Sequence, residues 1–185
     1  MMILASASPR RAELLAAAGF RFDVAPADVD ETPQPGESPT TYALRVAHDK
    51  AAAAPAALAG GARIILAADT VVAIDGQILG KPVDGDDAAR MLRLLSGRLH
   101  EVHTAVVVRD GEREQHAVVT TRVRFQPLSD SEITWYVASG EPDGKAGAYA
   151  IQGLGARFVE WIEGSWSNVV GLPIATVYRL LDGRN

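Results

Sequence analysis

"LASASPRRAELLAAAGF", residues 4–20, decides the class of fold because it takes the chain directly from a strand into a helix. The apolar run Met2–Ala5 predicts a short buried strand. Ser8 is a natural N-cap followed by proline, so we expect a helix over Pro9–Ala18. Gly19 suits the position just beyond its end. A strand followed at once by a helix is the start of a βα unit.

The charge of this helix start is unusual. Arg10 and Arg11 fall in its first turn, where exposed N–H groups already make the helix end positive. With the hydroxyls of Ser6 and Ser8, the two guanidiniums would form a cradle for phosphate. An ordinary Ser-Pro cap with solvated arginines fits the same residues, and the local sequence does not choose between the two.

The rest of the chain mixes helices with β-hairpins. Strands are expected at 20–24, 62–69 and 156–164, hairpins around Asp75-Gly76 and Asp110-Gly111, and helices at 39–50 with the alanine tract 51–59, from Asp84 or Asp86 to Gly97, from Ser129 to Gly140, and at 172–181. The segment 144–155 is glycine-rich and expected to be irregular. This order predicts an α/β or α+β domain built on a mixed sheet.

Composition narrows the class of protein. The 185 residues are 48% hydrophobic and 22% charged, which is enough for the core of one compact domain. The net charge of −5 argues against broad binding of nucleic acid. The absence of cysteine excludes disulfides, thiolate metal sites and a cysteine nucleophile. With no signal peptide or long apolar span in view, the expected location is the cytoplasm.

Acidic residues offer candidate metal ligands. Asp69 is expected at the end of the strand 62–69, where ligand sites of open α/β sheets gather. A carboxylate there could hold Mg²⁺ or orient a water molecule, although a turn aspartate would look the same. Asp30 and Glu31 could complete an oxygen site for a hard cation with Asp69, or they could form a solvated acidic loop.

Three further polar residues suit a nucleotide site. Lys81 follows Gly80 and is placed for a phosphate contact, although its local sequence favours a solvated loop lysine. Lys50, on its expected helix, could reach a ligand or lie along the surface. Gln152 has donors and an acceptor, as reading a base edge requires. Residues 153–155 lack the context of a dinucleotide-binding motif.

Other catalytic patterns are missing from the sequence. It contains no HExxH zinc motif, no GxSxG nucleophile elbow and no P-loop. His100 and His103 are expected at the surface. The three tryptophans are expected in the core or at an interface: Trp135, Trp161 and Trp166.

Five segments together resemble the Maf family of nucleoside triphosphate pyrophosphatases, from Ile3 to about Leu181: "LASASPRRAELL", "AADTVV", "GKPVDGDDAARMLRLLSGRLHEVHTAV", "YVASGEPDGKAGAYAIQGLG" and "GSWSNVVGLP". The resemblance implies a single Maf-type domain over residues 1–185. It implies an elongated mixed β-sheet with flanking helices and two lobes around a cleft, similar to inosine triphosphate pyrophosphatases. It also implies hydrolysis of a nucleoside triphosphate to monophosphate and pyrophosphate with Mg²⁺ or Mn²⁺, and suggests a homodimer.

The resemblance assigns roles to the candidate residues. It makes Asp69 the proton acceptor and a metal ligand with Glu31, and it places these side chains on the substrate: Arg10, Thr70, Gln152, Arg11, Lys81, Lys50 and Ser8. "AADT" and "YAIQGLG" look like the branch that acts on dTTP and UTP, with modified pyrimidine triphosphates as further substrates. The alternatives are a 7-methyl-GTP pyrophosphatase and a nucleotide-binding regulator of septum formation. Asp69 together with the arginine pair favours an enzyme.

Overall fold

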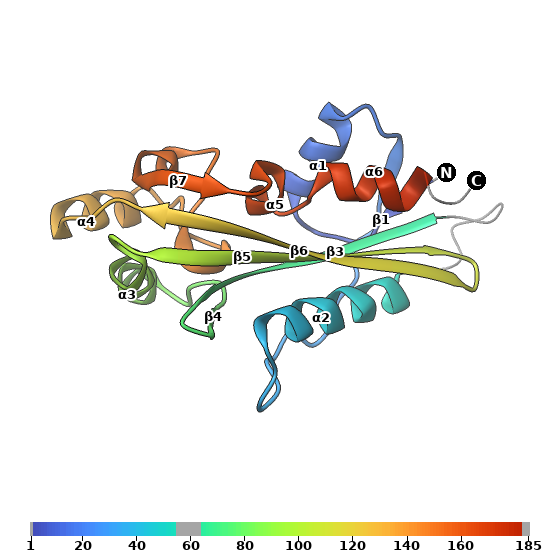
Figure 1. The fold of residues 1–185 in the computed structure, drawn as a ribbon, viewed down its shortest axis with the longest axis horizontal. Helices are drawn as coiled ribbons and strands as arrows, with labels where there is room; N and C mark the ends of the chain where they lie inside the picture. The colour runs from blue at the N-terminus through green and yellow to red at the C-terminus, as the bar shows by residue number, and fades with distance from the viewer. Residues whose placement is uncertain (1, 55–63, 183–185) are drawn as a thin grey trace. The chain divides into compact units, whose positions relative to one another are not determined.

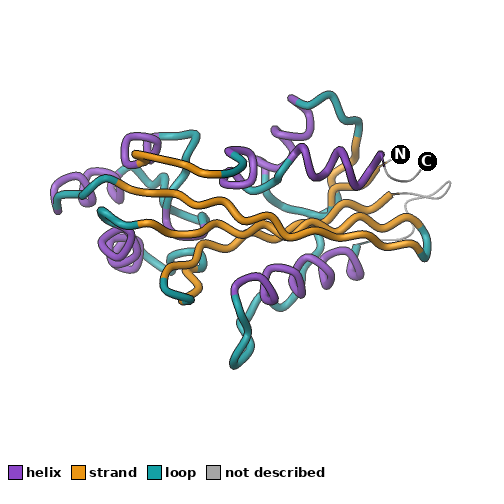
Figure 2. Tube along the Cα trace, viewed as in Figure 1, coloured by secondary structure: helices purple, strands orange, loops and turns teal. Residues whose placement is uncertain are grey.

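The protein has a mixed α/β fold, seen in a computed structural model that describes residues 2–54 and 64–182 (Figures 1 and 2). In these residues the strands are β1 (Met2–Leu4), β2 (Phe22–Val24), β3 (Ile64–Ile74), β4 (Gln77–Leu79), β5 (Leu99–Asp110), β6 (Arg113–Phe125) and β7 (Val159–Glu163). The helices are α1 (Pro9–Ala17), α2 (Pro39–Ala53), α3 (Gly85–Leu95), α4 (Asp130–Ala138), α5 (Trp166–Val170) and α6 (Ile174–Asp182), with 3₁₀ turns η1 (Ala146–Ala148) and η2 (Leu154–Phe158).

The seven described strands form one mixed sheet in the order β2-β1-β3-β5-β6-β7, with β4 paired to β3. β1 pairs in parallel with both β2 and β3, as βα units require. β4 and β7 pair antiparallel with their neighbours. The predicted mixed sheet with flanking helices is therefore confirmed. Each helix in the described part of the chain is too short or too polar to cross a lipid bilayer.

Local sequence signals explain most of these boundaries. Ser38 and Asp84 cap α2 and α3 by accepting hydrogen bonds from the N–H groups of Thr41 and Asp87. Ser129 and Glu132 form the predicted capping box of α4. Asp75 and Gly76 both have positive φ, 51° and 77°, as the tight turn between β3 and β4 needs.

The described residues form two compact units. The first comprises Met1–Thr70, Thr104–Val119 and Gly171–Asn185, and the second comprises Val71–His103 and Thr120–Val170. In the first unit, α2 lies on one side of β3, and α1 and α6 lie on the other (Figure 1). The apolar faces of α1 and α6 pack on the sheet through Leu15 and Val177. Whether the chain is one functional domain stays a prediction.

The second unit is built on an aromatic core. Phe125 of β6 contacts the rings of Tyr149 and Phe158, with centroids 4.8 and 6.0 Å apart. Tyr136 of α4 stands edge-on to Phe158 at 5.0 Å. Such edge-to-face contacts are favourable beyond the apolar area that they bury. This core supports η1, η2 and the turn between them.

The prediction that two histidines lie at the surface was wrong, and for the three tryptophans only the interface alternative stays a prediction. His100 and His103 lie inward on β5 and are only 2% and 4% exposed. Trp135, Trp161 and Trp166 are 40%, 43% and 49% exposed, so they are not core residues. His100 shares a buried face of β5 with Val102, whereas His103 lies on the other face, which is also buried from this position onward.

The structure also differs from expectation in where β3 ends and in containing the helix α5. β3 continues to Ile74, so Asp69 lies within this strand and not at its end. Its buried residues past position 69 extend the pairing into the hairpin with β4. The short helix α5 was not predicted. The alanine tract after Ala53 falls largely outside the described residues.

Candidate functional site

The first unit contains a buried ion cluster around Lys50 of α2. The Lys50 ammonium lies 2.7 Å from Oδ1 of Asp69 on β3 and 2.6 Å from Oε1 of Glu31. The side chains of Lys50 and Asp69 are each 9% exposed, and that of Glu31 is 36% exposed. Lys50 is therefore neither a surface lysine nor a snorkelling one, because its side chain is buried and its ammonium group is paired inside the protein. The cluster joins three of the predicted site residues.

Two residues of α2 fix the acidic loop that carries Glu31. The Tyr42 hydroxyl donates to the Glu31 carbonyl oxygen at 2.8 Å. Arg45 binds both carboxylate oxygens of Glu37, at 2.7 and 3.0 Å, and donates to the Thr32 carbonyl oxygen at 3.0 Å. Such a two-pronged arginine contact fixes orientation as well as distance. The loop is thus held at both the Glu31 and the Glu37 positions.

Burial raises the pKa of Tyr42 to about 12, with the nearby charges of Asp69 and Glu31 adding to the effect. The phenol therefore keeps its proton near neutral pH and remains a donor to the Glu31 carbonyl. Asp30 turns away from the cluster, since its Oδ1 accepts from the N–H of Thr32 at 2.8 Å. Of the two acidic neighbours, Glu31 is the one that contacts Lys50.

Arg11 is buried, although it belongs to the first turn of α1. Its three guanidinium nitrogens each donate one hydrogen bond: Nε to the Gly171 carbonyl oxygen at 2.8 Å, Nη1 to Ser6 Oγ at 3.0 Å and Nη2 to Thr70 Oγ1 at 3.0 Å. Burial lowers the pKa of Arg11, Asp69 opposes this, and Arg10 lowers it further. An arginine nevertheless stays charged in proteins. That Arg11 also contacts phosphate stays a prediction.

Thr70 lies next to Asp69 and is saturated with hydrogen bonds. Its hydroxyl donates to the Gly171 carbonyl oxygen at 3.2 Å, accepts from Arg11 and lies 3.0 Å from the hydroxyl of Thr104. A hydroxyl has one donor and two acceptor positions, so these contacts use them all. Gly171 has a φ of 129°, a conformation that favours glycine. A Cβ there would also approach Thr70 to 3.6 Å.

Arg10 and Ser8 flank this network at the start of α1. Ser8 occupies the N-cap position, but its side chain makes no capping bond, and its N–H donates to Ser6 Oγ at 3.2 Å. The first turn contains no acidic residue. Arg10 is partly exposed and lies close enough to Arg11 to lower its pKa. The helix start is therefore basic, as the sequence predicted.

The other two predicted residues belong to the second unit. Lys81 is exposed just after β4, next to Gly80, whose carbonyl oxygen accepts from the N–H of Gly147 at 3.1 Å. Gln152 is exposed in a turn closed by a bond from the Gly153 N–H to the Ala150 carbonyl oxygen at 3.2 Å. Both side chains are therefore exposed on loops of the second unit.

Two carboxylates of the cluster, and not a complete set of protein ligands, are available to a divalent cation. Within residues 2–54 and 64–182, no group of three or more histidine, aspartate or glutamate side chains converges as a metal site. Asp69 and Glu31 supply two carboxylates on either side of Lys50. Mg²⁺ is often held by one or two carboxylates together with substrate phosphates and water, and this pair suits that arrangement.

Several residues that hold the site were missed by the sequence interpretation. Thr104, Gly171 and Tyr42 each contact a predicted residue. Gly171 lies 160 positions from Arg11 in the chain, and no local pattern signals such a contact. Positive φ at Gly171 is invisible in the sequence for the same reason.

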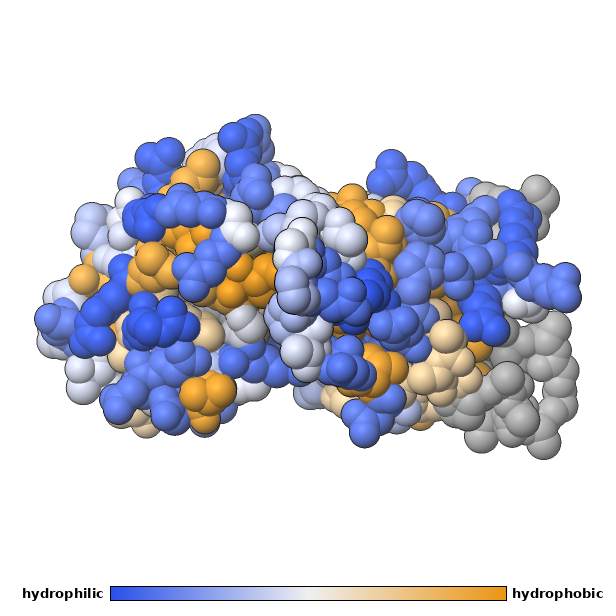
Figure 3. All heavy atoms as spheres, turned by 90° about the horizontal axis from the view of Figure 1, so that it is seen from below, coloured by the Kyte–Doolittle hydropathy of each residue, from blue (hydrophilic) through white to orange (hydrophobic). Residues whose placement is uncertain are grey.

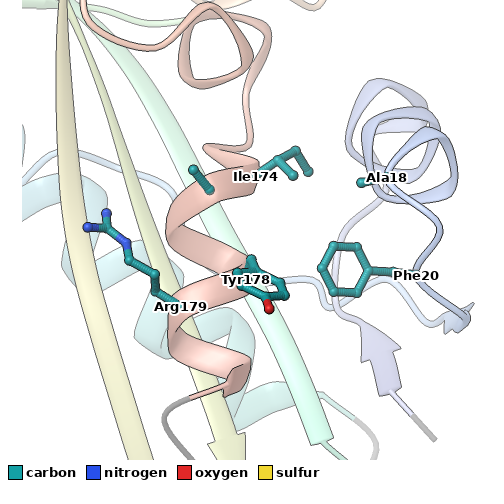
Figure 4. A pocket seen from close by; sticks show the side chains of 6 residues that line it. Ala18, Phe20, Ile174, Tyr178 and Arg179 are labelled. Atoms are coloured by element: carbon teal, nitrogen blue, oxygen red, sulfur yellow. The ribbon is translucent and has the colours of Figure 1, made fainter.

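A shallow pocket of ≈ 540 Å³ lies elsewhere in the first unit, between the end of α1 and α6 (Figure 4). Phe20 and Tyr178 face each other across it, and Ile174 and Ala18 line its apolar part (Figure 4). None of the predicted site residues lines it. The face that carries α2 is different in character, with hydrophilic side chains spread between small apolar areas (Figure 3).

The family model and the curated relatives that match this chain agree on one family. Residues 1–184 match the family described as Maf-like protein. The chain is 56% identical over 184 residues to a protein of Anaeromyxobacter dehalogenans strain 2CP-1 named dTTP/UTP pyrophosphatase, covering 97% of this chain and 92% of that relative. Proteins with the same name from Geobacter sulfurreducens and Myxococcus xanthus are 55% and 50% identical, covering 95% and 98% of this chain and 92% and 91% of the relatives. A match along essentially the whole sequence means that the chain belongs to the Maf family.

Proposed function

We propose that this protein hydrolyses dTTP and UTP to the nucleoside monophosphate and pyrophosphate, and that it acts on modified pyrimidine triphosphates as well. The observation that carries the proposal is the buried Glu31–Lys50–Asp69 cluster next to the basic start of α1, in a chain 50–56% identical to relatives named dTTP/UTP pyrophosphatase. An acid buried beside cations is suited to charge-separating chemistry on a polyanion.

Asp69 is the general base. Lys50 bonds its Oδ1 at 2.7 Å, which fixes the carboxylate and leaves Oδ2 to orient a water molecule. That water attacks the α-phosphorus in line as the pyrophosphate leaves. Phosphoryl transfer depends mainly on positioning and on charge stabilisation, so no serine or cysteine nucleophile is required.

Cationic side chains hold the phosphates. Arg10 and Lys81 are the direct contacts, because both are at least partly exposed. The Ser8 hydroxyl, free of a capping bond within α1, adds a donor. Arg11 and Lys50 add positive charge from buried positions, where their protein contacts keep them in place.

Asp69 and Glu31 would hold a divalent cation, Mg²⁺ or Mn²⁺, as the cofactor. When bound, it would neutralise phosphate charge. In the free protein, the Lys50 ammonium contacts both carboxylates and so offsets the repulsion between Asp69 and Glu31.

Gln152 and Thr70 select the base. The Gln152 amide offers both donor and acceptor to a pyrimidine edge. Thr70 contacts substrate by exchanging its bond to Gly171 or Thr104 for one to the ligand. Sites that hydrogen-bond their substrate reject analogues that leave those groups unpaired.

The test is pyrophosphate release from a panel of triphosphates with Mg²⁺ or Mn²⁺, including 7-methyl-GTP. We expect dTTP and UTP to give the highest kcat/KM. Asp69→Asn should lower kcat by about a hundredfold or more and retain dTTP binding, since a general base contributes to the rate and not to ground-state affinity. Asp182→Asn, the same change at the exposed end of α6, is the matched control.

Other outcomes identify the alternatives. Fastest turnover of 7-methyl-GTP would select the related pyrophosphatase activity. Nucleotide binding with no turnover of any triphosphate, and full activity in Asp69→Asn, would each contradict the proposal. The first of these would support a regulator of septum formation.

We also propose that the protein is cytoplasmic and forms a homodimer, with the nucleotide as its only other partner. The acidic net charge of −5 supports the lack of a nucleic-acid partner. Light scattering of the purified protein measures the mass in solution, and a monomer at micromolar concentration would contradict the dimer.

A further inference from the structure

The turn that displays Gln152 is held on both sides by one pair of side chains, Tyr136 and Glu141. Before the turn, the N–H of Ala150 donates to the Tyr136 hydroxyl at 3.1 Å. After the turn, the N–H groups of Leu154 and Gly155 donate to Glu141 Oε2 and Oε1 at 2.8 and 2.9 Å.

The two side chains are themselves joined. The Tyr136 hydroxyl donates to Glu141 Oε1 at 2.7 Å, so it gives one bond and accepts another. Tyr136 is fully buried on α4, in edge contact with Phe158. The Tyr136 hydroxyl and the Glu141 carboxylate therefore connect both ends of an exposed turn to α4 and the aromatic core.

Two glycines of this segment make room for the pair. A Cβ on Gly153 would collide with the Glu141 carboxylate, and one on Gly155 would lie 2.8 Å from both the Tyr136 hydroxyl oxygen and the Ala150 carbonyl oxygen. Neither glycine has positive φ, so space and not backbone conformation requires them. The Gly-Leu-Gly sequence at 153–155, which fits no dinucleotide-binding motif, is thus explained by the close approach of Glu141, Tyr136 and the Ala150 backbone.

Glu141 acts here as a charged acceptor. Partial burial raises its pKa, but the N–H bonds from Gly155 and Leu154 and the Tyr136 hydroxyl outweigh this, and the pKa is lowered. Charge-assisted bonds from backbone N–H groups to a carboxylate are among the stronger hydrogen bonds in proteins.

We propose that Tyr136 and Glu141 are positioning residues for base selection: they fix the backbone around Gln152 so that its amide meets a pyrimidine edge in one orientation. This inference rests on the proposed function, and in particular on Gln152 as the residue that reads the base. Neither Tyr136 nor Glu141 contacts the substrate in this scheme.

The physical need for such a clamp follows from the side chain of glutamine. Gln152 is exposed and reaches its ligand through three flexible bonds, so a mobile backbone would let its amide pair with many base edges. Hydrogen bonds weaken steeply as their angle departs from linear. Discrimination between bases by Gln152 therefore depends on a fixed position of its backbone. A loosened turn would thus lose selectivity before it lost catalysis.

Glu141→Gln is the sharpest variant because it keeps the size and removes the charge. In the wild type, each carboxylate oxygen of Glu141 accepts from a different backbone N–H, of Leu154 or Gly155. The NH₂ group of glutamine cannot accept, so it would face one of these two N–H donors and that hydrogen bond would be lost. Tyr136→Phe is the second variant, and it removes the bond to Ala150 from the other side of the turn. Asp143→Asn, at an exposed position two residues from Glu141, is the matched control.

The measurements are kcat and KM for dTTP, UTP and ATP, together with amide hydrogen exchange at Leu154 and Gly155. In Glu141→Gln we expect the ratio of kcat/KM for dTTP to that for ATP to fall about tenfold, the effect of losing one hydrogen bond to a substrate. The loss should appear mainly in KM for dTTP. Exchange at both amides should accelerate, and Tyr136→Phe should change the ratio in the same direction.

Gln152→Ala separates this inference from the proposed function. The inference predicts that Gln152→Ala lowers the same ratio and that adding Glu141→Gln lowers it no further. An equal loss of rate with all three triphosphates in Glu141→Gln would show a structural role only and overturn the inference. An unchanged ratio in Gln152→Ala would overturn it too, while hydrolysis of dTTP by the wild type and its loss in Asp69→Asn would leave the pyrophosphatase activity standing.

Discussion

The two units of the molecule handle buried polar groups in opposite ways. The first unit buries charges and pairs them: Lys50 lies between two carboxylates, and Arg11 makes three hydrogen bonds. The second unit buries titratable groups in neutral form. His100 bonds the Tyr149 hydroxyl at 2.9 Å among aromatic rings, and the charged Glu141 stays near the surface.

The difference follows from what each unit must hold. Side chains that neutralise a polyanion have to be charged, and burial strengthens their fields because the surroundings screen them less. A turn that presents one side chain needs only backbone hydrogen bonds, which a single carboxylate and a phenol supply. We therefore expect the first unit to be sensitive to the loss of an ion-pair partner and the second to be sensitive to acid.

The largest effect on stability should come from Lys50→Met. This change leaves the buried Asp69 carboxylate facing Glu31 without its counterion, and we expect a loss of about 3 kcal/mol in the free energy of unfolding. Urea denaturation measures this loss. Arg93→Met in the second unit breaks an exposed salt bridge, in which Nη2 of Arg93 lies 3.0 Å from Oδ1 of Asp130. This change should lower the free energy of unfolding by less than about 1 kcal/mol. Equal losses in the two variants would remove the distinction between the units.

Acid should act on the second unit through His100. Burial lowers the pKa of His100 to about 4, and the Arg98 backbone carbonyl offsets this only in part. Because the unfolded value is near 6.5, the unfolded chain binds the proton first as the pH falls. The contribution to stability is complete above pH 6.5 and is lost as the pH falls toward 4, by about 3 kcal/mol in all.

His100→Gln removes this titration and should flatten the fall in the free energy of unfolding between pH 6.5 and 4. A slope that does not change in His100→Gln would mean that His100 is protonated equally in both states.

The smallest of these effects is expected from Arg11→Lys. Lysine keeps the charge but cannot reproduce three bonds in a planar arrangement, so the links to Ser6 and Thr70 are not both maintained. We expect about 2 kcal/mol lower stability by thermal or urea unfolding. Arg90→Lys, on the exposed side of α3, should stay within about 0.5 kcal/mol of the wild type. A neutral Arg11→Lys would show that the buried bonds add little beyond charge.

Local patterns were sufficient for much of the fold. The caps Ser38, Asp84 and Ser129 and the Asp75-Gly76 turn act over four residues or fewer, so their signals are complete within a short segment of sequence. The mixed sheet followed from the alternation of these segments. The strand end at Asp69 was misplaced because buried residues continue beyond it, and an apolar run does not reveal where pairing stops.

The sequence by itself determined the class of fold, the basic start of α1 and the membership of Asp69, Lys50 and Glu31 in a set of candidate residues. Only the tertiary structure decided that Lys50 joins the two acids, that Arg11 is buried against Gly171, and that Glu141 holds the turn of Gln152. The reason is physical. Caps and turns depend on neighbours in the chain, whereas the partner of a buried charge is set by which distant strands and helices pack together.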